Sequence, residues 1–509
     1  MNRFAKGALT ALGGAVAAET LRRLLLSGDG QRYEPWERAP YRDFPNRVLI
    51  LGGGFAGYTA AKNLCRMTRG RDDVGVMVIS RENFFTFWPM LAGCISSDID
   101  TNNVAQPLRR ALIREGASFR RADVEGLNLE KRCVTAAGKE FPYEHLVLAL
   151  GAEPAYFGIP GVEEHAISIK GISAAEAIRN RVIERYEETT LAHGDVPDSR
   201  LTFVVIGGGA TGVEVAAELH ALVHDILAPD YPNINPHRAR IVLVDSNEQI
   251  LKELDPALRR AARIKLAALQ IEVLNRVKAK EIRADRVILS DGNEILTENA
   301  IWTAGARASE KLDDLPLPAD ERKGLKTDVF MRVEGHENVW GIGDCAATVE
   351  EDGTPVPPNA QAAVQEGKVV ARNILAAIDG KQMRPFDYKP VGQLVEIGDH
   401  FAVNEVMNFK FSGLLASLFW RATYLYKLES PQSRARIAAD WILDLFFDPA
   451  VTQIRDRTKD IDPQPAAHRL VPGQEGPDLR ALLVYLDARR QHPLRRPVRL
   501  GRRHLLHAP

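Results

Sequence analysis

Runs of consecutive apolar residues that end in a glycine-rich turn occur twice along the chain. The first run, Val48–Leu51, leads into the turn 52–57, a helical stretch at 58–67 and a second apolar run at 74–80. Apolar runs without polar alternation are typical of strands that are buried on both faces of a parallel sheet. The pattern therefore predicts a strand, a helix and a second strand parallel to the first.

The same unit returns further along the chain. Strands are predicted at 203–206 and 241–244, and between them lie the turn 207–212 and a helix over about 213–222. A repeated strand, turn and helix is much stronger evidence than one glycine pattern alone.

Two further apolar runs indicate how the units are connected. The run 146–150 ends in Gly151, and a matching run at 339–342 ends in Gly343 and Asp344. We therefore predict an α/β fold in which the second unit is inserted into the first, so that the later strand completes the first sheet.

Beyond residue 386 the pattern becomes amphipathic and aromatic. One apolar stripe at helical spacing consists of Phe411, Leu414, Leu415, Leu418, Phe419, Ala422 and Leu425, and a second consists of Trp441, Ile442, Leu445 and Phe446. Both stripes indicate helices that lie on a membrane surface, with packing against the protein core as the alternative. The arginine-rich segment from Arg489 onward suggests either attraction to anionic lipid or a solvated end.

Composition narrows the class of protein. The chain has 509 residues, of which 45% are hydrophobic and 26% charged, with a net charge of −1. These values exclude a disordered chain, and the near-zero charge gives no reason to expect nucleic-acid binding. Four cysteines are too few for a disulfide scaffold and suggest a reducing compartment. No apolar run is long enough for a membrane-spanning helix, and the stretch 7–18 is interpreted as an amphipathic helix, with a secretory signal as the alternative.

The glycines of both turns follow the spacing Gly-x-Gly-x-x-Gly. They are Gly52, Gly54 and Gly57 in the first turn and Gly207, Gly209 and Gly212 in the second. A dinucleotide pyrophosphate needs backbone N–H groups at close range and a helix N-terminus behind them, and glycine permits both. The two turns therefore predict two dinucleotide sites in Rossmann-like domains.

The residue that ends the second strand of each unit bears on which dinucleotide binds. Asp245 holds this position in the second unit, where a carboxylate accepts hydrogen bonds from a ribose 2′-hydroxyl and repels a 2′-phosphate. We therefore predict NADH rather than NADPH. Ser80 holds the position in the first unit and leaves the ribose contact open. Asp344 is predicted to bind a flavin ribityl hydroxyl, with a helix cap as the alternative.

These segments together resemble the pyridine nucleotide-disulfide oxidoreductase family, flavoproteins with two dinucleotide-binding domains. The chain lacks the closely spaced cysteine pair of the disulfide reductases. Within the family it is most similar to type II NADH dehydrogenase over about residues 46–450. The segments that carry the resemblance are 52–57, 83–91, 207–219, 301–305, 341–346 and 360–367. The last, Ala-Gln-Ala-Ala-Val-Gln-Glu-Gly, resembles the family's quinone-site motif, whereas Trp88 departs from the family pattern.

The resemblance implies an FAD-dependent NADH:quinone oxidoreductase of the respiratory chain that does not pump protons. It implies a catalytic role for Glu214 near the nicotinamide and for Gln361 and Gln365 at the quinone, with purely structural roles in their helices as alternatives. The expected cofactor-binding residues are Gly52, Gly54, Phe55, Ala56, Gly57, Ser80, Gly151, Gly343, Asp344 and Ala362 for FAD, and Gly207, Gly209, Gly212, Asp245 and Gly305 for NADH. No metal site is expected.

The expected partners are NADH, a membrane quinone and the membrane surface. The resemblance also suggests a homodimer, held peripherally on the cytoplasmic face of the membrane. Two alternatives stay open. One is a sulfide:quinone oxidoreductase that uses Cys133 and Cys345 or Cys94, and the other is a flavin-bound regulatory protein with weak redox activity.

The expected organisation follows from these segments. It comprises an N-terminal extension and linker (1–45), a first part of the FAD-binding domain (46–165), the NADH-binding domain (166–300), a second part of the FAD-binding domain (301–385), a membrane-associating region (386–450) and a basic tail (451–509).

Overall fold

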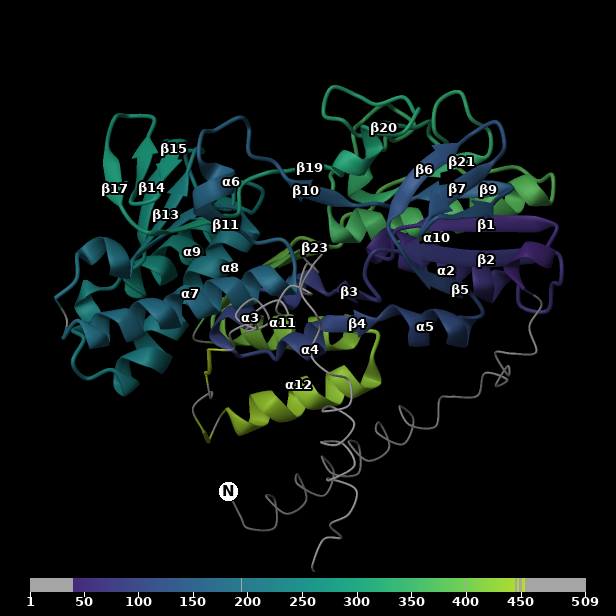
Figure 1. Cartoon of the computed structure of the whole chain (residues 1–509). Coiled ribbons are helices and arrows are strands. Elements are labelled where there is room, and N and C mark those ends of the chain that lie inside the picture. The colour runs from purple at the N-terminus through teal and green to yellow at the C-terminus, as the bar shows by residue number, and fades with distance from the viewer. Residues whose placement is uncertain (1–39, 194, 399, 445, 448–450, 454–509) are drawn as a thin grey trace, which may run out of the picture. The chain divides into compact units, whose positions relative to one another are not determined.

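The computed structural model describes residues 40–193, 195–398, 400–444, 446–447 and 451–453. The predicted N-terminal helix, the arginine-rich tail and Leu445 of the second apolar stripe lie outside the described residues. Two parallel sheets organise the remainder, and each is built around one of the predicted units (Figure 1).

The first sheet has five parallel strands in the order β21-β9-β1-β2-β5. Their bounds are β1 Asn46–Leu51, β2 Val74–Ser80, β5 Ser118–Arg121, β9 His145–Leu148 and β21 Val339–Gly341. Leu51, the last residue before the first glycine turn, lies opposite Ile79 on one side and Leu148 on the other. β21 pairs with β9 although the second unit separates them in sequence, which confirms the predicted insertion.

The second sheet repeats this arrangement with the order β11-β18-β12-β13-β14. Its strands are β11 Ala166–Ser168, β12 Thr202–Ile206, β13 Arg240–Asp245, β14 Glu272–Asn275 and β18 Asn299–Trp302. Ile206, directly before the second glycine turn, lies opposite Val244 and Trp302. Both glycine turns therefore emerge at the carboxyl edge of a parallel sheet, where such folds bind ligands.

Helices cover the sheets and carry the candidate site residues. They are α2 Phe55–Met67, α5 Leu108–Glu115, α7 Ile172–Leu191, α8 Ala210–His220, α9 Pro256–Ala268 and α10 Ala360–Ile378. α8 begins at Ala210, earlier than the predicted Val213, and continues into a π-helical segment at Ala221–Leu227. α2 and α10 pack closely at Gly367. A Cβ added to this glycine would collide with the backbone of α2 at Ala56, so the absence of a side chain permits the contact.

Smaller elements complete the two units. Three-stranded antiparallel sheets are formed by β6 Val124–Asn128, β7 Cys133–Ala136 and β8 Lys139–Pro142, and by β15 Ala279–Arg283, β16 Arg286–Leu289 and β17 Glu294–Leu296. The short pairs are β3 Phe84–Thr86 with β4 Ala105–Pro107, and β20 Leu325–Lys326 with β22 Ala346–Ala347. The short helices are α3 Gly93–Ser96, α4 Thr101–Val104 and α6 Val162–His165.

Two chain crossings connect the first sheet to the second. β10 Ala152–Pro154 leaves the first unit and β19 Ala306–Ala308 returns to it, and the two strands pair antiparallel (Figure 1). The two connections between the units are therefore hydrogen-bonded to each other. Both are short, and both join the units near the carboxyl edges of the two sheets.

The C-terminal region adds a three-stranded antiparallel sheet and two helices. The strands are β23 Gly392–Glu396, β24 Ala402–Val406 and β25 Phe409–Gly413, and the helices are α11 Leu414–Lys427 and α12 Pro431–Leu443. The predicted apolar stripe is corrected at its start, because Phe411 belongs to β25 and the helix begins only after Gly413, whose φ is +93°. Among the described residues, no helix is both long and apolar enough to cross a bilayer.

Candidate functional site

The first glycine turn forms a cradle with an open face. Gly52 has a φ of +104°, and a Cβ there would collide with the carbonyl oxygen of Ala149. A Cβ at Gly57 would collide with the carbonyl oxygen of Gly52, so this glycine lets α2 approach the strand. Gly54, by contrast, faces open space, and as the N-cap of α2 it leaves the first helical N–H groups without a side-chain partner. Free N–H groups beside open space are what a pyrophosphate requires.

The other residues expected to hold the flavin surround this cradle. Phe55 begins α2, and a Cβ added to Gly343 would lie 3.0 Å from the Cβ of Ala56. Ser80 ends β2, beside the position that a Cβ on Gly53 would occupy. Gly151 has a φ of +73° and faces open space. The structure therefore brings together segments from 52–57, 80, 151 and 343, which are far apart in sequence.

The second glycine turn repeats the same geometry. Gly207 has a φ of +119°, and a Cβ on it would press against Thr303 and Ala304. A Cβ at Gly212 would collide with the carbonyl oxygen of Gly207, while Gly209 again faces open space as an N-cap without a side-chain bond. The two turns are thus alike residue by residue, and each suits a dinucleotide pyrophosphate.

Asp245 ends β13 beside the second turn. Its Oδ1 accepts hydrogen bonds from the backbone N–H and the Nδ2 of Asn247, at 2.7 and 2.8 Å. Its Oδ2 faces Gly208, where a Cβ would collide with it. The carboxylate is therefore held against the glycine turn, in position to meet a ribose. Gly305, in the connection back to the first unit, has a φ of +74° and lies against the ring of Phe157.

Asp344 and Glu366 are the acidic groups at the carboxyl edge of the first sheet. Desolvation raises the pKa of Asp344, and the Lys170 ammonium opposes this rise. The Glu366 carboxylate accepts a short hydrogen bond from the backbone N–H of Gly343, and burial raises its pKa to about 7. Lys170 also lies over the ring of Trp88, with Nζ 5.1 Å from the centroid. The Lys170 ammonium therefore interacts both with the Trp88 ring and with the Asp344 carboxyl group.

The N-terminus of α10 is capped by Asn359, whose Oδ1 accepts from the N–H groups of Gln361 and Ala362, both at 2.9 Å. Gln361 and Gln365 use their amides for backbone contacts with the segment that returns along the helix. Gln365 donates to the carbonyl of Lys389 at 2.9 Å and accepts from its N–H at 3.1 Å. No local sequence pattern predicts these partners, because they lie more than 20 residues away along the chain.

Glu214 is on α8, two residues after the second glycine turn. Desolvation raises its pKa well above the ordinary value for a glutamate. Its Oε1 accepts from the backbone N–H of Glu396 at 3.4 Å, and burial, with a smaller contribution from the Glu214 carboxyl group, raises the pKa of the Tyr424 phenol on α11. The carboxyl group therefore faces the C-terminal region as well as its own helix.

Two further glutamates beside Glu214 were missed by sequence reasoning. Glu218 lies one turn later on α8, and burial raises its pKa to about 8. Glu396 ends β23, and burial raises its pKa to about 7. Their hydroxyl partners are Ser96, which donates a short hydrogen bond to Glu218, and Ser417, which donates to Glu396 at 2.7 Å. The spacing of four residues from Glu214 could have revealed Glu218, whereas Glu396 comes from a remote strand.

Arg421 connects this group of acids to the surface helix α12. It lies 3.5 Å from both Glu396 and Asp98 and packs over the Trp441 ring at 4.7 Å. Trp441 in turn donates from Nε1 to Asp98 at 3.2 Å. The site thus contains carboxyl groups with raised pKa values that can hold protons near neutral pH, next to an arginine that compensates for part of the charge.

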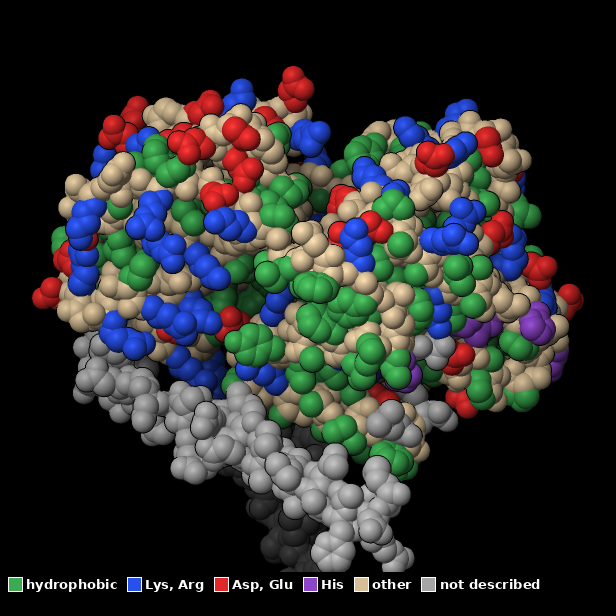
Figure 2. All heavy atoms as spheres, turned by 180° about the vertical axis from the view of Figure 1, so that it is seen from behind, with side chains coloured by type: hydrophobic (Ala, Val, Ile, Leu, Met, Phe, Trp, Pro, Cys, Tyr) green, Lys and Arg blue, Asp and Glu red, His purple; other side chains and the backbone are tan. Residues whose placement is uncertain are grey.

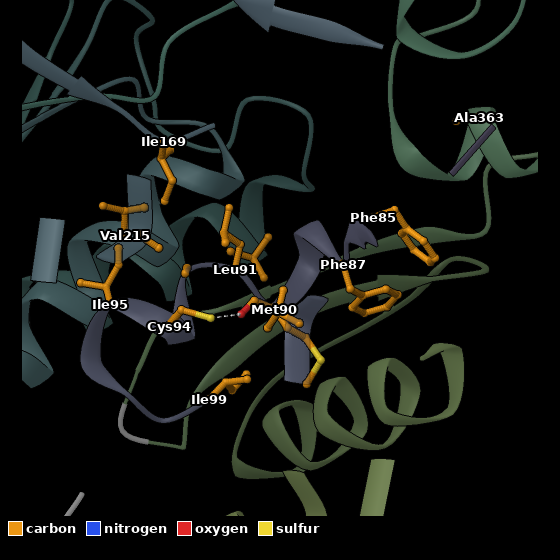
Figure 3. Close-up of a cluster of buried hydrophobic side chains, with 14 of the residues drawn as sticks. Phe85, Phe87, Met90, Leu91, Cys94, Ile95, Ile99, Ile169, Val215 and Ala363 are labelled. Carbon is orange, nitrogen blue, oxygen red and sulfur yellow. Dashed lines mark hydrogen bonds between the residues drawn. The ribbon is translucent and has the colours of Figure 1, made fainter. Parts of the chain in front are cut away.

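The cysteines considered for sulfide chemistry are all buried and free. Figure 3 shows Cys94 among Met90, Ile95 and other apolar side chains, with its Sγ directed to the Met90 carbonyl oxygen. Burial raises the pKa of Cys94 and raises that of Cys345 to about 12. Because the thiolate is the reactive form, these environments disfavour nucleophilic chemistry.

The chain is similar to known proteins both in sequence and in structure. The profile of the pyridine nucleotide-disulphide oxidoreductase family matches residues 46–367, and that of the NDH2 C-terminal domain matches residues 391–448. The type II NADH:quinone oxidoreductase NdhA of Mycobacterium tuberculosis is 30% identical over 419 residues, which are 78% of this chain and 86% of the relative. A probable NADH dehydrogenase of Dictyostelium discoideum is 29% identical over 412 residues, 79% of this chain and 90% of the relative.

Solved structures show the same fold. NDH2 from Plasmodium falciparum in complex with NADH matches with a TM-score of 0.72 at 20% identity, covering 80% of this chain and 99% of that protein. The sulfide:quinone oxidoreductase of Aquifex aeolicus matches with a TM-score of 0.61, also at 20% identity, covering 79% and 96%. At such identities the likeness concerns the fold alone.

Proposed function

Because the chain belongs to the pyridine nucleotide-disulphide oxidoreductase family and carries an NDH2 C-terminal domain, we propose that it is a type II NADH:quinone oxidoreductase. It oxidises NADH through bound FAD and reduces a membrane quinone without pumping protons. Two relatives with similar coverage are named type II NADH:quinone oxidoreductases, and a third is named a probable NADH dehydrogenase.

The observation that carries the proposal is the pair of matching glycine cradles, one on each sheet. The open space at Gly54 and Gly209, with uncapped helix N-termini behind them, suits FAD in the first cradle and NADH in the second. When bound, FAD supplies the hydride-accepting and electron-passing chemistry. Asp245 selects NADH, because its carboxylate suits a ribose hydroxyl and repels a 2′-phosphate. Asp344 holds the flavin's ribityl chain.

The groups between the second cradle and the C-terminal region serve the quinone. Glu214, with its raised pKa, holds a proton that can be delivered as the quinone is reduced. Gln361 keeps one amide N–H and one oxygen lone pair beyond its backbone contacts, so it can also meet a quinone carbonyl, and Gln365 lies one turn further along the same helix face. The N-terminus of α10 adds a partial positive charge that favours negative charge on a bound group nearby.

The membrane association of the family is proposed for α11 and the end of α12. Exposed apolar side chains on these elements are Leu414, Leu415, Leu418, Phe419, Ile442, Leu443, Phe446 and Phe447. Figure 2 shows hydrophobic side chains gathered over the central and lower part of one face. Such a surface suits a helix pair lying in the lipid interface. A homodimer and attachment to the cytoplasmic face remain part of the same proposal.

Anaerobic mixing tests the central proposal. The purified flavoprotein is mixed in turn with NADH, NADPH and sulfide, and then with a short-chain quinone, while flavin absorbance is followed. We expect bleaching by NADH, slower bleaching by NADPH, none by sulfide, and reoxidation by the quinone. Bleaching by sulfide alone would overturn the proposal and return the chemistry to the cysteines.

A further inference from the structure

The segment that links α10 to β23 runs back along the helix without forming a helix or strand of its own. We call residues 384–391, together with Gly392 at the start of β23, the strap. Three amide side chains of α10 hold its backbone in antiparallel order: Asn373 pairs with Arg384, Gln365 with Lys389, and Gln361 with Val391 and Gly392. Residues 361, 365 and 373 are spaced by multiples of four, which places them on one face of the helix.

Each amide uses both its donor and its acceptor. Asn373 donates to the Arg384 carbonyl and accepts from its N–H, both at 2.9 Å. Gln365 makes the same pair of bonds to Lys389. Gln361 accepts from the Val391 N–H at 3.1 Å and donates to the carbonyl of Gly392. Side chains thus do for the strap what a neighbouring strand does in a sheet.

Two further backbone donors of the strap are also paired. Phe386 donates its N–H to the Val329 carbonyl at 2.8 Å, and its side chain is buried. Tyr388 donates its N–H to Glu350 at 2.7 Å. Pro385 and Pro390 have no N–H to satisfy. Because paired backbone groups fix an extended segment, the strap holds a defined register along α10.

That register has a consequence for the site. The strap continues directly into β23, whose last residue, Glu396, donates its N–H to Glu214 and brings its own carboxyl group close by. We propose that Gln361 and Gln365 are positioning residues, which fix the strap and thereby set Glu396 against Glu214 on the other unit. This inference rests on the proposed function, because it assigns the glutamines a part in quinone reduction that acts through Glu396.

The hydrogen bonds from Gln361 and Gln365 to the strap are here called the clamp. Hydrogen exchange of the flavin-bound enzyme, with no quinone present, tests the clamp directly. We expect the peptide spanning the strap to exchange about fivefold faster in Gln361→Ala and Gln365→Ala, which each lose hydrogen bonds. Gln365→Glu keeps the acceptor for the Lys389 N–H but loses the donor, so it should fall between Gln365→Ala and the native chain. Gln382→Ala, at an exposed glutamine just before the strap, is the matched control and should leave the exchange unchanged. Native exchange rates in both clamp variants would overturn the proposal.

A double-mutant cycle tests whether the clamp acts through Glu396. The quantity measured is kcat/KM for a short-chain quinone in Gln365→Ala, Glu396→Gln and the double variant. If the strap works by setting Glu396, the double variant loses little more than the worse single variant, whereas Gln382→Ala with Glu396→Gln gives additive effects. Additive losses for Gln365 and Glu396 would contradict the proposal. An enzyme that reduces no quinone would contradict the proposed function instead, and the exchange result would still decide the clamp.

Discussion

Glu214 and Glu218 show how an environment, rather than a residue type, sets the chemistry of a site. Both are glutamates of α8 and lie one turn apart, and desolvation raises the pKa of each. Near neutral pH such groups carry protons, which an exposed glutamate does not. Burial makes it costly to ionise either carboxyl group, so each group holds a proton. The same proton is available for transfer to a bound group.

The first prediction concerns stability against pH. The pKa of Glu218 rises from 4.5 to about 8 on folding, so the folded protein binds more protons than the unfolded chain between these values. The contribution of Glu218 to the free energy of unfolding is therefore most favourable below about pH 4.5, and it decreases as pH rises toward 8. Glu218→Gln keeps an acceptor for Ser96 but cannot ionise. We expect its Tm to exceed the native value by about 2–4 °C at pH 8 and to match it at pH 5.

Thermal unfolding across this pH range, with Glu321→Gln as an exposed control, is the measurement. A native-like pH dependence in Glu218→Gln would show that the carboxyl group does not titrate in this window.

The second prediction separates the glycines of the first cradle. Gly54 has a φ of −73°, which any residue adopts, and faces open space, so Gly54→Val should fold normally but fill the room that a pyrophosphate needs. We expect flavin content to fall at least tenfold while the Tm of the apoprotein changes little. Gly57→Ala, which collides with Gly52, should lose both flavin and stability.

Absorbance of bound flavin and circular dichroism report the two effects. Gly126→Val is the control, because Gly126 also faces open space but lies on β6, away from the cradle. Full flavin content in Gly54→Val would remove the first cradle as the FAD site.

At the scale of elements, local sequence patterns predict the helices and strands around the glycine turns, but not the start of α11 or the strap. The strands and helices around both glycine turns follow from apolar runs and turn glycines that lie within a few residues of each other. The spacing of Phe411 predicts a helical position, but pairing with Asn404 of β24 keeps this residue in a strand. The strap and its glutamine partners were not predictable, since their bonds join segments that no sequence period connects.

The third prediction concerns the exposed face of α11. Leu415 and Leu418 are 76% and 54% exposed, so replacing both by glutamate costs the fold little and places charge where lipid contact is proposed. We expect binding to anionic vesicles to fall at least tenfold, while reduction of a short-chain soluble quinone by NADH continues. Leu296→Glu on β17, also exposed, is the matched control. Undiminished vesicle binding in the double variant would assign the attachment to another part of the chain.

At the scale of the whole molecule, the insertion decides which parts can stand alone. The first sheet needs β21 from beyond the inserted unit, so no continuous stretch of chain contains it without the second unit. The second sheet is complete within one stretch, from β11 to β18. The candidate site lies where both units and the C-terminal sheet meet. Gln361 comes from the first unit, Glu214 from the second and Glu396 from the C-terminal sheet. Its assembly therefore depends on tertiary contacts, which is why sequence reasoning identified Glu214 and Gln361 one at a time but did not identify Glu396 or the contacts between them.

This difference in continuity gives a fourth prediction. Residues 159–305, expressed alone, contain every strand of the second sheet together with β15–β17, and should fold and bind NADH. Their stability should be lower than that of the intact chain, because α7 and α8 lose the apolar contacts that α3 makes with them. The Asp245 carboxylate and the second cradle remain whole, so NADH affinity should stay within about tenfold of the intact value, a change of about 1.4 kcal/mol. Circular dichroism and NADH fluorescence measure the two properties, and Gly212→Ala in the same fragment should abolish both. An unfolded fragment would mean that the buried face toward α3 and the C-terminal sheet, rather than the continuous sheet, holds this unit together.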